Sequence, residues 1–511
     1  MKKRLAKILK TPWYFTAFAA YPVLALLSYN ISEVRFTAGI RSLVLSVAGA
    51  TVLFLIFRLI YRSWQRAAFT VTALTLLFFS YGHIYDLLSR QIKFPYLTPC
   101  MLGVWLVLFI LTLVWAGRRK TKFRKATIGL NIISLGLVLV VLVQVVWWSL
   151  PLRRGETADD HAPLQALHIP SRRALPDIYY IIPDSYGRSD LLLQAFQINN
   201  SVFIQRLQEM GFYVAGCSQS NYNRTDVSLG SSLNMDYLQN LDDSYKPDND
   251  NRGTLLASIN QSAVRFELER AGYKTVAFAT GFAWSEITNA DVYLAPSPAW
   301  FEMSSFETLL IRTTTGRHFE DLSGFHLDQI DGQRYRERTQ LVLSSMHELA
   351  HMPGPKFVFI HIISPHPPFV YGPDGTPTDP AAFLDQNHVY EAGAYARGYT
   401  NQVEYISGQL ETAFSTLLSE SSTPPVIVLQ GDHGPWMQTG SNMFEILNAY
   451  YLPGHNDLLY PTISPVNTFR LVLDTYLGTD YPLVDDTSYF SPIPNIYAFV
   501  KTANPCLNHK G

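Results

Sequence analysis

Acidic residues are scarce in the first part of this sequence of 511 residues. Residues 1–150 contain 18 of the 40 Lys and Arg but only two of the 41 Asp and Glu, namely Glu33 and Asp86. Their net charge is therefore +16, whereas residues 151–511 contain 22 bases and 39 acids and carry a net charge of −17. This asymmetry indicates two domains in different surroundings. The acidity of the second part argues against a nucleic-acid partner, because phosphate binding requires a basic surface.

Cysteine is almost as scarce, with three residues in the whole chain: Cys100, Cys217 and Cys506. Three cysteines cannot supply the several cross-links of a disulfide framework, and their spacing matches no zinc-binding pattern. Cys217 and Cys506 would pair only if both face an oxidising space, and two ordinary thiols are the alternative. The acidic part is about 360 residues long, which is enough to bury the core of one large α/β domain.

Long apolar runs are confined to the first part of the chain. Five of them approach or exceed the roughly 20 residues that cross the hydrocarbon core of a bilayer. They cover 12–29, 40–61, 67–88, 98–117 and 127–150. Five Lys and Arg precede the first run, as in a signal peptide, but no small-residue cleavage site follows it. We therefore predict a five-helix transmembrane bundle over residues 1–150, because the buried helices of a soluble protein would not combine five such runs with this charge bias.

Positive charge is distributed unevenly among the loops of this bundle. The segments 58–66 and 118–125 contain nine Lys and Arg. The loops on the other side contain only Arg35, Arg41, Arg90 and Lys93. By the positive-inside rule the N-terminus is cytoplasmic, and five spans place everything after Trp148 on the opposite side. We therefore expect a multi-pass protein of the plasma (inner) membrane whose second part is periplasmic or extracellular.

The second part reads as a linker followed by one α/β domain. Residues 151–175 are polar and aperiodic and are predicted to form the linker, and residues 176–511 the domain. Short β-rich runs occur at 177–185, 274–280, 356–363, 424–432 and 447–453. Amphipathic helical patterns lie between them, for example at 200–212, 262–273 and 401–418. This alternation predicts a mostly parallel sheet covered by helices on both faces.

Residues that can bind a metal ion follow three of these strands. Asp184 comes directly after the run YYIIP, Asp432 and His433 follow VIVLQG, and His361 and His366 flank the end of a third strand. Functional side chains collect beyond the carboxyl ends of parallel strands, so we expect these residues to meet. Carboxylate and imidazole together suit Zn²⁺ or Mn²⁺. Taken one at a time, an acid after a strand is as well explained by a helix cap, and GDHG by a turn.

A hydroxyl is the natural partner of such a site. The segment 218–238 is rich in hydroxyl groups, and Thr225 opens its helical part. The N-terminus of a helix attracts phosphate, and a metal ion lowers the pKa of a coordinated hydroxyl enough to make it a nucleophile. An N-cap threonine is the alternative interpretation of Thr225, and Ser220 and Ser228 are competing hydroxyls.

In this order, Asp184, Thr225, the histidines at 361–366 and the pair Asp432–His433 resemble the alkaline-phosphatase superfamily. Within it they are most similar to membrane-anchored, sulfatase-like enzymes: lipoteichoic-acid synthases, phosphoglycerol transferases and phosphoethanolamine transferases. Those relatives also place several membrane spans before an extracytoplasmic catalytic domain. The resemblance therefore implies an alkaline-phosphatase-like fold and extends to the architecture of the whole chain.

The resemblance also implies roles for single residues. One divalent metal ion, Zn²⁺ or Mn²⁺, would be bound by Asp184, Thr225, Asp432 and His433, with Thr225 as the nucleophile. The element SPHPPF is similar to a Ser-His-Gly-Pro-Tyr element of the family, and this similarity implies that His366 contacts the phosphate. The implied substrate-binding residues are His361, His366 and, from a helix motif at 399–401, Asn401.

Several departures from the family pattern bear on the activity. The transferases often have Glu in place of Asp184 and usually have Glu in place of Pro435. After His433 only two further histidines occur, so a phosphoethanolamine-transferase site would be incomplete, and a second metal ion lacks an obvious set of ligands. Cys217 lies outside the C-x-P-S-R context of sulfatases, which disfavours sulfatase activity. The segments 280–291 and 446–470 could line the site or simply close the domain.

We expect a phospho-group transferase that forms a phospho-threonine intermediate at Thr225. ATP is scarce outside the cytoplasm, so the expected donor is a membrane phospholipid that supplies a phosphoglycerol or phosphoethanolamine head group. The acceptor would be a glycan, lipid or polymer of the cell envelope. A phosphodiesterase, phosphatase or sulfatase-type hydrolase would use the same residues, and a membrane protein without enzymatic activity is the third possibility.

Overall fold

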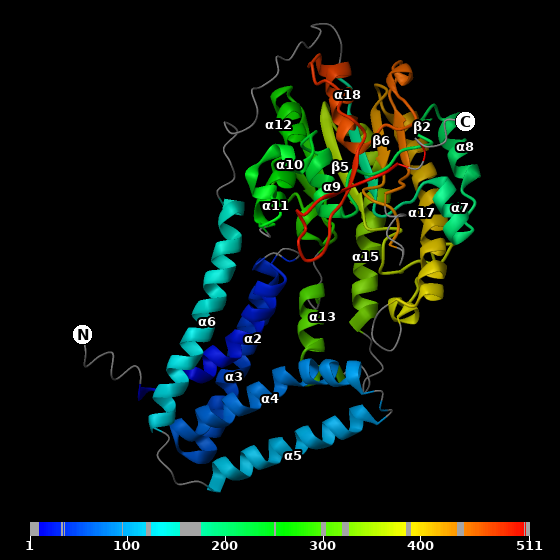
Figure 1. The fold of residues 1–511 in the computed structure, drawn as a ribbon. Coiled ribbons are helices and arrows are strands. Elements are labelled where there is room, and N and C mark those ends of the chain that lie inside the picture. Colours follow the sequence, from blue (N-terminus) through cyan, green and yellow to red (C-terminus); the bar gives the residue numbers. More distant parts are fainter. Residues whose placement is uncertain are drawn as a thin grey trace. The chain divides into compact units, whose positions relative to one another are not determined.

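The chain folds as two units in the computed structural model (Figure 1). The first comprises Met1–Ser149 and Trp300–Asp331, and the second comprises Leu150–Ala299 and Gly332–Gly511. The structure describes residues 10–31, 34, 36–92, 94, 96–118, 124–153, 175–249, 252–297, 303–318, 327–384, 390–436, 444–504 and 506. Most of the predicted linker, 154–174, lies outside the described residues. Grouping of Trp300–Asp331 with the N-terminal unit was not anticipated from the sequence.

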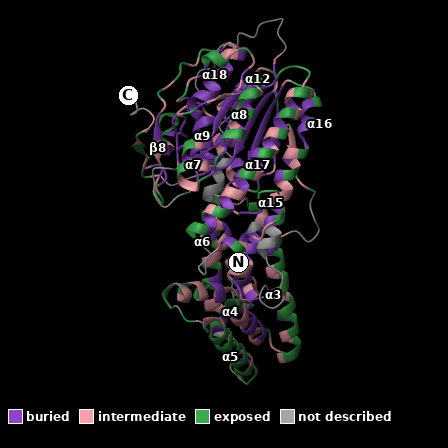
Figure 2. Ribbon diagram, turned by 90° about the vertical axis from the view of Figure 1, so that its right-hand side faces the viewer, coloured by how far each residue is buried: buried purple, intermediate pink, exposed green. Residues whose placement is uncertain are grey.

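Apolar helices form the first unit at the five predicted places. They are α2 Tyr14–Tyr29, α3 Ile40–Tyr61, α4 Trp64–Gln91, α5 Leu97–Arg118 and α6 Arg124–Arg153. Four apolar segments are long enough to cross a membrane: Phe36–Tyr61, Trp64–Ser89, Leu97–Arg118 and Ala126–Val146. The helix α2 has only 16 residues, so a fifth span is not confirmed and stays a prediction. Figure 2 shows exposed residues over most of α5, as expected of a helix whose apolar side chains face lipid.

A seven-stranded, mostly parallel sheet forms the centre of the second unit, as predicted. The strands are β1 Ile178–Pro183, β2 Tyr213–Val214, β3 Lys274–Phe278, β4 Val292–Leu294, β5 Lys356–Ile362, β6 Val426–Gln430 and β7 Asn448–Tyr451. Their order across the sheet is β2-β7-β6-β1-β5-β3-β4. The strand β7 runs in the opposite direction to the other strands of the sheet. A separate antiparallel pair is formed by β8 Ser488–Phe490 and β9 Val500–Thr502.

Helices cover both faces of this sheet, as the alternation of the sequence predicted. On one face lie α9 Thr225–Ser232, α11 Gly253–Asn260, α12 Ala263–Arg270 and α18 Pro465–Leu477. On the other lie α7 Ser189–Phe196, α8 Ser201–Glu209, α15 Leu327–Ser344, α16 Met346–His351 and α17 Ala392–Glu420. The short helix α10 spans Leu238–Leu241, and α13, Ser305–Arg312, belongs to the first unit.

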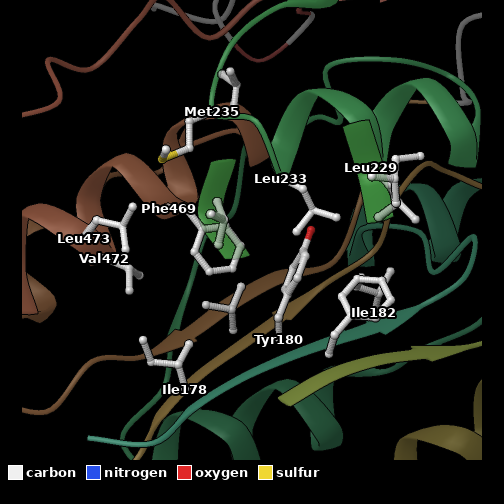
Figure 3. Packing of buried hydrophobic residues seen from close by; sticks show 14 of the residues in the cluster. Ile178, Tyr180, Ile182, Leu229, Leu233, Met235, Phe469, Val472 and Leu473 are labelled. Carbon is white, nitrogen blue, oxygen red and sulfur yellow. The ribbon is translucent and has the colours of Figure 1, made fainter. Parts of the chain in front are cut away.

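The side chains of β1 explain why both faces must be covered. Ile178, Tyr180 and Ile182 pack in the hydrophobic cluster on one face, shown in Figure 3. Tyr179 and Ile181 pack in the cluster on the opposite face. Successive side chains of a strand point to opposite faces, so a continuous apolar run requires burial on both. This central strand therefore holds its carboxyl end in a fixed position between the two layers of helices.

Cys217 and Cys506 form a disulfide bond, which decides between the two alternatives that their sequence positions left open. The bond joins residues that are 289 positions apart in the chain. Asn504 reinforces the connection, because its side-chain amide donates a hydrogen bond to the Cys217 carbonyl oxygen at 3.2 Å. The C-terminal segment is thereby held against the start of the segment that leads into α9. Cys100 is an exposed free thiol.

Candidate active site

Three neighbouring strands end at the same edge of the sheet. β1 lies between β5 and β6 and runs parallel to both. Asp184 directly follows β1, and His361 is the last residue but one of β5, in register with Ile182. Asp432 and His433 follow β6 after a single glycine. The carboxyl ends of parallel strands thus bring together side chains that are far apart in sequence.

A buried group of three side chains can hold a metal ion. The ligand atoms of Asp184, Asp432 and His433 all lie within 4.8 Å of one another. His433 Nε2 is 3.7 Å from Asp184 Oδ1 and 3.5 Å from Asp432 Oδ2. The three residues are 3%, 2% and 7% exposed, and neither of these two carboxylate oxygens has a hydrogen-bond partner. Buried polar atoms without partners are costly, and a divalent cation would satisfy both at once.

Hydrogen bonds orient the ligand atoms toward one another. His433 Nδ1 donates to the Gly434 carbonyl oxygen at 2.7 Å, so the lone pair of Nε2 faces the carboxylates. Asp432 Oδ1 accepts from the backbone N–H of Ser185 at 2.9 Å, which leaves Oδ2 for a cation. Ser185 itself has a φ of +65°, in the left-handed region that non-glycine residues rarely adopt. Strained backbone of this kind is concentrated at functional sites, where the surrounding contacts maintain it.

Thr225 places its hydroxyl beside this group. Its Oγ1 lies 3.3 Å from His433 Nε2. Thr225 is the first residue of α9, and Arg224 occupies the N-cap position, so the N-cap interpretation of Thr225 does not describe its place. Of the competing hydroxyls, Ser228 donates to the Asp432 carbonyl oxygen at 2.6 Å, and Ser220 makes no contact with the ligand group in the described residues. Of the three candidate hydroxyls, that of Thr225 is the one recorded within 3.5 Å of a ligand atom in the described residues.

The charges around Asp184 and His433 stabilise one another. Burial alone raises the pKa of Asp184, yet His366, His361 and His433 together hold it well below its ordinary value. Burial lowers the pKa of His433, but Asp432 and Asp184 overcome this effect and raise it above the ordinary 6.5. In the absence of a cation these shifts favour an ionised Asp184 beside a protonated His433. A metal ion would take the place of that proton.

His361 approaches Asp184 from β5 and is supported by a chain of hydrogen bonds. Its Nε2 lies 3.3 Å from Asp184 Oδ2, and its Nδ1 is 2.8 Å from Ser285 Oγ. Ser285 donates to Thr280 Oγ1 at 3.0 Å, and Thr280 donates to Glu286 Oε2 at 2.9 Å. These residues belong to the segment 280–291, whose role the sequence left open. In this structure the hydrogen-bonded side chains of the segment fix the position of the His361 ring.

His366 lies near the ligand group, next to His433. Its ring centroid is 6.3 Å from that of His433, and its Nδ1 donates to the Pro367 carbonyl oxygen at 2.6 Å. Gln402 of α17 donates to the carbonyl oxygen of His366 at 3.1 Å. Asn401, the residue expected from the helix motif, is partly buried beside it. It is Gln402, rather than Asn401, that forms hydrogen bonds to the backbone next to the site in the described residues.

Tyr399 connects α17 to the turn after β1. Its hydroxyl donates to the Ser185 carbonyl oxygen at 2.9 Å and accepts from the Gly187 N–H at 3.1 Å. Tyr399 is fully buried, and its hydroxyl is engaged by these two backbone groups. Sequence reasoning missed this residue as a support, although it lies in the motif that pointed to Asn401. The motif therefore marks where the helix meets the turn that carries Asp184.

A buried metal-ligand set beside a threonine at a helix N-terminus, on a mostly parallel α/β sheet, defines an enzyme of the alkaline-phosphatase superfamily. The sequence profile of the sulfatase family matches residues 176–462, which is more than half of the chain. The chain therefore belongs to the sulfatase family and is a sulfatase-like transferase or hydrolase. No curated protein matches it in sequence.

Solved structures of low sequence identity are similar to the chain. The periplasmic domain of EptC from Escherichia coli, in complex with Zn, is 14% identical, with a TM-score of 0.44 over 66% of this chain and 96% of that chain. The phosphoethanolamine transferase EptA from Neisseria meningitidis is 12% identical, with a TM-score of 0.39 over 92% and 94% of the two chains. A phosphonate monoester hydrolase from Agrobacterium radiobacter is 13% identical, with a TM-score of 0.40 over 63% and 82%.

Proposed function

We propose that this chain is a metal-dependent phospho-group transferase that moves the head group of a membrane phospholipid to an acceptor in the cell envelope. The observation that carries this proposal is the group formed by Asp184, Asp432 and His433 around the hydroxyl of Thr225. Two carboxylates and an imidazole offer a divalent cation its preferred ligands, and Zn²⁺ and Mn²⁺ both suit them. The helix N-terminus at Thr225 favours a negatively charged phosphate at the same place.

In the first half-reaction, Thr225 Oγ1 attacks the phosphorus atom of the lipid phosphodiester. A bond forms between Oγ1 and phosphorus, and the bond from phosphorus to the diacylglycerol oxygen breaks. When bound, the cation lowers the pKa of the hydroxyl, whose proton passes to solvent, and offsets charge on the phosphoryl oxygens. His366 is placed to hydrogen-bond those oxygens or to protonate the departing diacylglycerol, because its Nδ1–H is already engaged by Pro367 and its Nε2 remains for this role.

In the second half-reaction, a hydroxyl oxygen of the acceptor attacks the phosphorus atom of the phospho-threonine. A bond forms between that oxygen and phosphorus, the Oγ1–phosphorus bond breaks, the acceptor proton passes to solvent, and Oγ1 regains a proton from solvent, which restores Thr225. The transferred group would be phosphoglycerol or phosphoethanolamine, and the acceptor a glycan, lipid or polymer of the envelope. His361 and Asn401 are proposed to contribute to binding the substrates. Apolar helices in the same chain favour a donor that arrives from the bilayer, since anchoring alone would need a single span. Water in place of the acceptor would make the same site a hydrolase.

The charge distribution supports a catalytic unit outside the cytoplasm. The basic segment 118–125 directly precedes the last apolar helix, Ala126–Val146, and the second unit follows that helix. If the basic segment is cytoplasmic, that helix leads outward whether or not Tyr14–Tyr29 crosses the membrane. The disulfide between Cys217 and Cys506 agrees with this side, because such bonds persist in oxidising compartments.

The test is lipid turnover by the purified full-length protein. Labelled phosphatidylglycerol and phosphatidylethanolamine are each incubated with Mn²⁺ or Zn²⁺, and diacylglycerol release and phosphorylated threonine are measured. We expect the wild type to release diacylglycerol and Thr225→Ala to lose at least about a thousandfold in rate. Ser220→Ala removes a buried hydroxyl of the same segment that lies outside the ligand group, and it should retain full activity.

The outcomes distinguish the candidate activities. Release that persists in Thr225→Ala would exclude this residue as the nucleophile. Cleavage of soluble phosphodiesters or sulfate esters without any lipid turnover would replace the transferase by a hydrolase. Absence of both activities in protein that binds no metal would leave a membrane protein without catalysis.

A further inference from the structure

A segment of the catalytic half of the sequence packs onto the membrane helices. Residues 303–318, which we call the docking segment, belong to the first unit, although the chain up to Ala299 and from Gly332 onward belongs to the second. Arg317 Nη1 donates to Asp86 Oδ1 at 2.8 Å. His318 Nε2 lies 2.7 Å from the hydroxyl of Tyr81, and both side chains are buried. The docking segment is thus attached to α4 by specific polar contacts.

The glycine at position 82 allows this close approach. The Gly82 N–H donates to the Thr313 carbonyl oxygen at 3.0 Å. A Cβ at this position would lie 2.3 Å from the carbonyl oxygen of Arg312, a distance that no side chain tolerates. The absence of a side chain therefore lets the backbone of the docking segment touch α4.

An ion pair attaches the same segment to α3. Arg41 Nε donates to Glu307 Oε1 at 2.6 Å, and a second bond joins its Nη2 to Glu307 Oε2. Glu307 is held by the N-terminus of α13, where it accepts from the Ser304 N–H at 2.9 Å. The Glu307 side chain is only 9% exposed, whereas that of Arg41 is 49% exposed. The Arg41 side chain is therefore half-exposed while Glu307 fixes its position.

A groove begins at this ion pair and continues between the membrane helices. Its first part, of about 430 Å³, is lined by α3, α4 and the docking segment and includes Arg41, Glu307 and Thr314. Its second part, of about 650 Å³, is lined almost entirely by apolar side chains of α3, α4 and α5. The two parts are continuous, because they share four lining residues: Leu45, Ser46, Phe78 and Phe79.

The groove is polar at one end and apolar at the other, as the binding site of an amphiphile would be. Charged and hydroxyl groups gather at the docking segment, and the far end is apolar, with Leu53, Leu106 and Phe109. These walls belong to segments long and apolar enough to cross a membrane. A soluble ligand would not match a volume of this size with so few polar groups, whereas acyl chains would. A phosphate at the polar end would meet the exposed guanidinium of Arg41, which pairs well with phosphate oxygens.

We propose that this groove binds one glycerophospholipid, with its acyl chains between α3, α4 and α5 and its phosphate at Arg41. The inference rests on the proposed function, since it identifies this lipid as the donor, which is bound here before its phosphate reaches Thr225. Chain connectivity supports the assignment: the stretch that contains the docking segment, Trp300–Asp331, is joined at both ends to the catalytic unit, so the same stretch of chain lines the polar end of the groove.

A pair of matched variants tests the acyl-chain site. Gly49 lines the groove, is exposed, and has no atom within 4 Å of an added Cβ, so Gly49→Leu fills the groove without a clash. Gly136 of α6 is equally exposed and open but lies outside the groove, so Gly136→Leu is the control. We expect Gly49→Leu to raise KM for long-chain phospholipid about tenfold, the loss of contact with about two methylenes. Gly136→Leu should leave KM unchanged.

The same assay distinguishes the role of Arg41 from that of Glu307. Arg41→Gln should raise KM for the lipid, whereas Glu307→Gln keeps the guanidinium and should change KM less. If the ion pair only fixes the docking segment, both variants will lose thermal stability and raise KM equally, and the phosphate contact is then wrong. A soluble phosphodiester without acyl chains gives the reference activity, and the control Gly136→Leu should cleave it at the wild-type rate.

Native mass spectrometry of Thr225→Ala provides a readout that is independent of turnover. We expect one retained phospholipid, and none in Thr225→Ala combined with Gly49→Leu. Equal lipid retention and equal KM in Gly49→Leu and Gly136→Leu would contradict binding of the lipid in the groove. A retained lipid that is never turned over marks a structural lipid and overturns its role as donor. Soluble diester cleavage that depends on Thr225, without turnover of any lipid, rejects the proposed function itself.

Discussion

Replacing Asp432 by asparagine distinguishes two contributions to the free energy of unfolding: the cost of burying the carboxylate and the stabilisation by a bound metal ion. Asp432 Oδ1 accepts a hydrogen bond from the Ser185 N–H at 2.9 Å, and an asparagine oxygen can keep that bond. Oδ2 has no hydrogen-bond partner and lies 3.5 Å from His433 Nε2. The substitution therefore preserves shape and one hydrogen bond, but it removes one negative charge and one metal ligand.

The expected effect on stability is small without metal and large with it. Without metal, the cost of burying the Asp432 charge and its attraction to His433 oppose each other, so metal-free Asp432→Asn should differ little in stability from the metal-free wild type. A metal ion present at a thousandfold excess over its Kd stabilises the wild type by about 4.1 kcal/mol. This corresponds to a rise in Tm on the order of 10 °C for a domain of roughly 150–250 residues, and to less for this larger unit. The variant should lose most of that rise.

The assay is thermal unfolding of the full-length protein in detergent, first with a chelator and then with excess Mn²⁺ or Zn²⁺. Among the described residues, a second group that could hold metal is formed by His347, His351 and Glu420, with both histidines exposed. Wild type and variant are therefore compared in a His347→Ala background. Asp457→Asn, which removes an exposed carboxylate far from β6 in sequence, controls for the change in charge.

Two results would contradict the assignment of the metal site. A metal-induced rise in Tm that is equal in Asp432→Asn and Asp457→Asn would mean that Asp432 is not a ligand. A metal-free Asp432→Asn protein that is several kcal/mol less stable than wild type would mean that the carboxylate has a structural partner. The site requires both a small metal-free effect and a large loss of the metal response.

Further substitutions test other features of the second unit: the buried carboxyl of Glu445, the support of His361, and the disulfide bond. Burial raises the pKa of Glu445, so its ionisation destabilises the fold at neutral pH and this cost disappears as pH falls below the unfolded pKa. Glu445→Gln should therefore raise the free energy of unfolding at pH 7.5 but not at pH 4, measured by denaturant titration; an equal effect at both values would exclude ionisation as the cause. Ser285→Ala removes the hydrogen bond at His361 Nδ1 and should lower kcat about tenfold with little change in Tm, whereas a matching loss of Tm would indicate a purely structural role. Cys217→Ser should lower the free energy of unfolding by about 2–5 kcal/mol under oxidising conditions and have a far smaller effect in reductant.

The main features of the fold were predictable because they depend on local pattern. The run over 177–185 is apolar on successive residues, which requires burial on both faces of a sheet, and it forms the central strand β1. The apolar helices were equally clear, because a bilayer requires long uninterrupted runs. The count of spans was less certain at the first run, where the helix Tyr14–Tyr29 is short.

The docking segment could not be predicted, since nothing in its own composition distinguishes it from the catalytic unit. Its place depends on partners more than 200 residues away, such as Asp86 for Arg317 and Tyr81 for His318. The disulfide is similar: Cys217 and Cys506 could be named, but only the folded chain brings them together. Contacts of this range leave no periodic signal in the sequence.

The sequence by itself determined the two-part organisation, the mostly parallel sheet and the candidate residues at the ends of its strands. Each follows from a rule that acts locally: charge beside apolar runs, alternation of strand and helix, and polar residues where a strand ends. Only the tertiary structure decided which candidates share one site. It joined Asp184, Asp432 and His433 within a few ångströms, with Thr225 beside His433, and it placed Gln402 against the backbone of His366. The physical reason is that a binding site is a set of distances between atoms, and those distances are fixed by the packing of helices against the sheet.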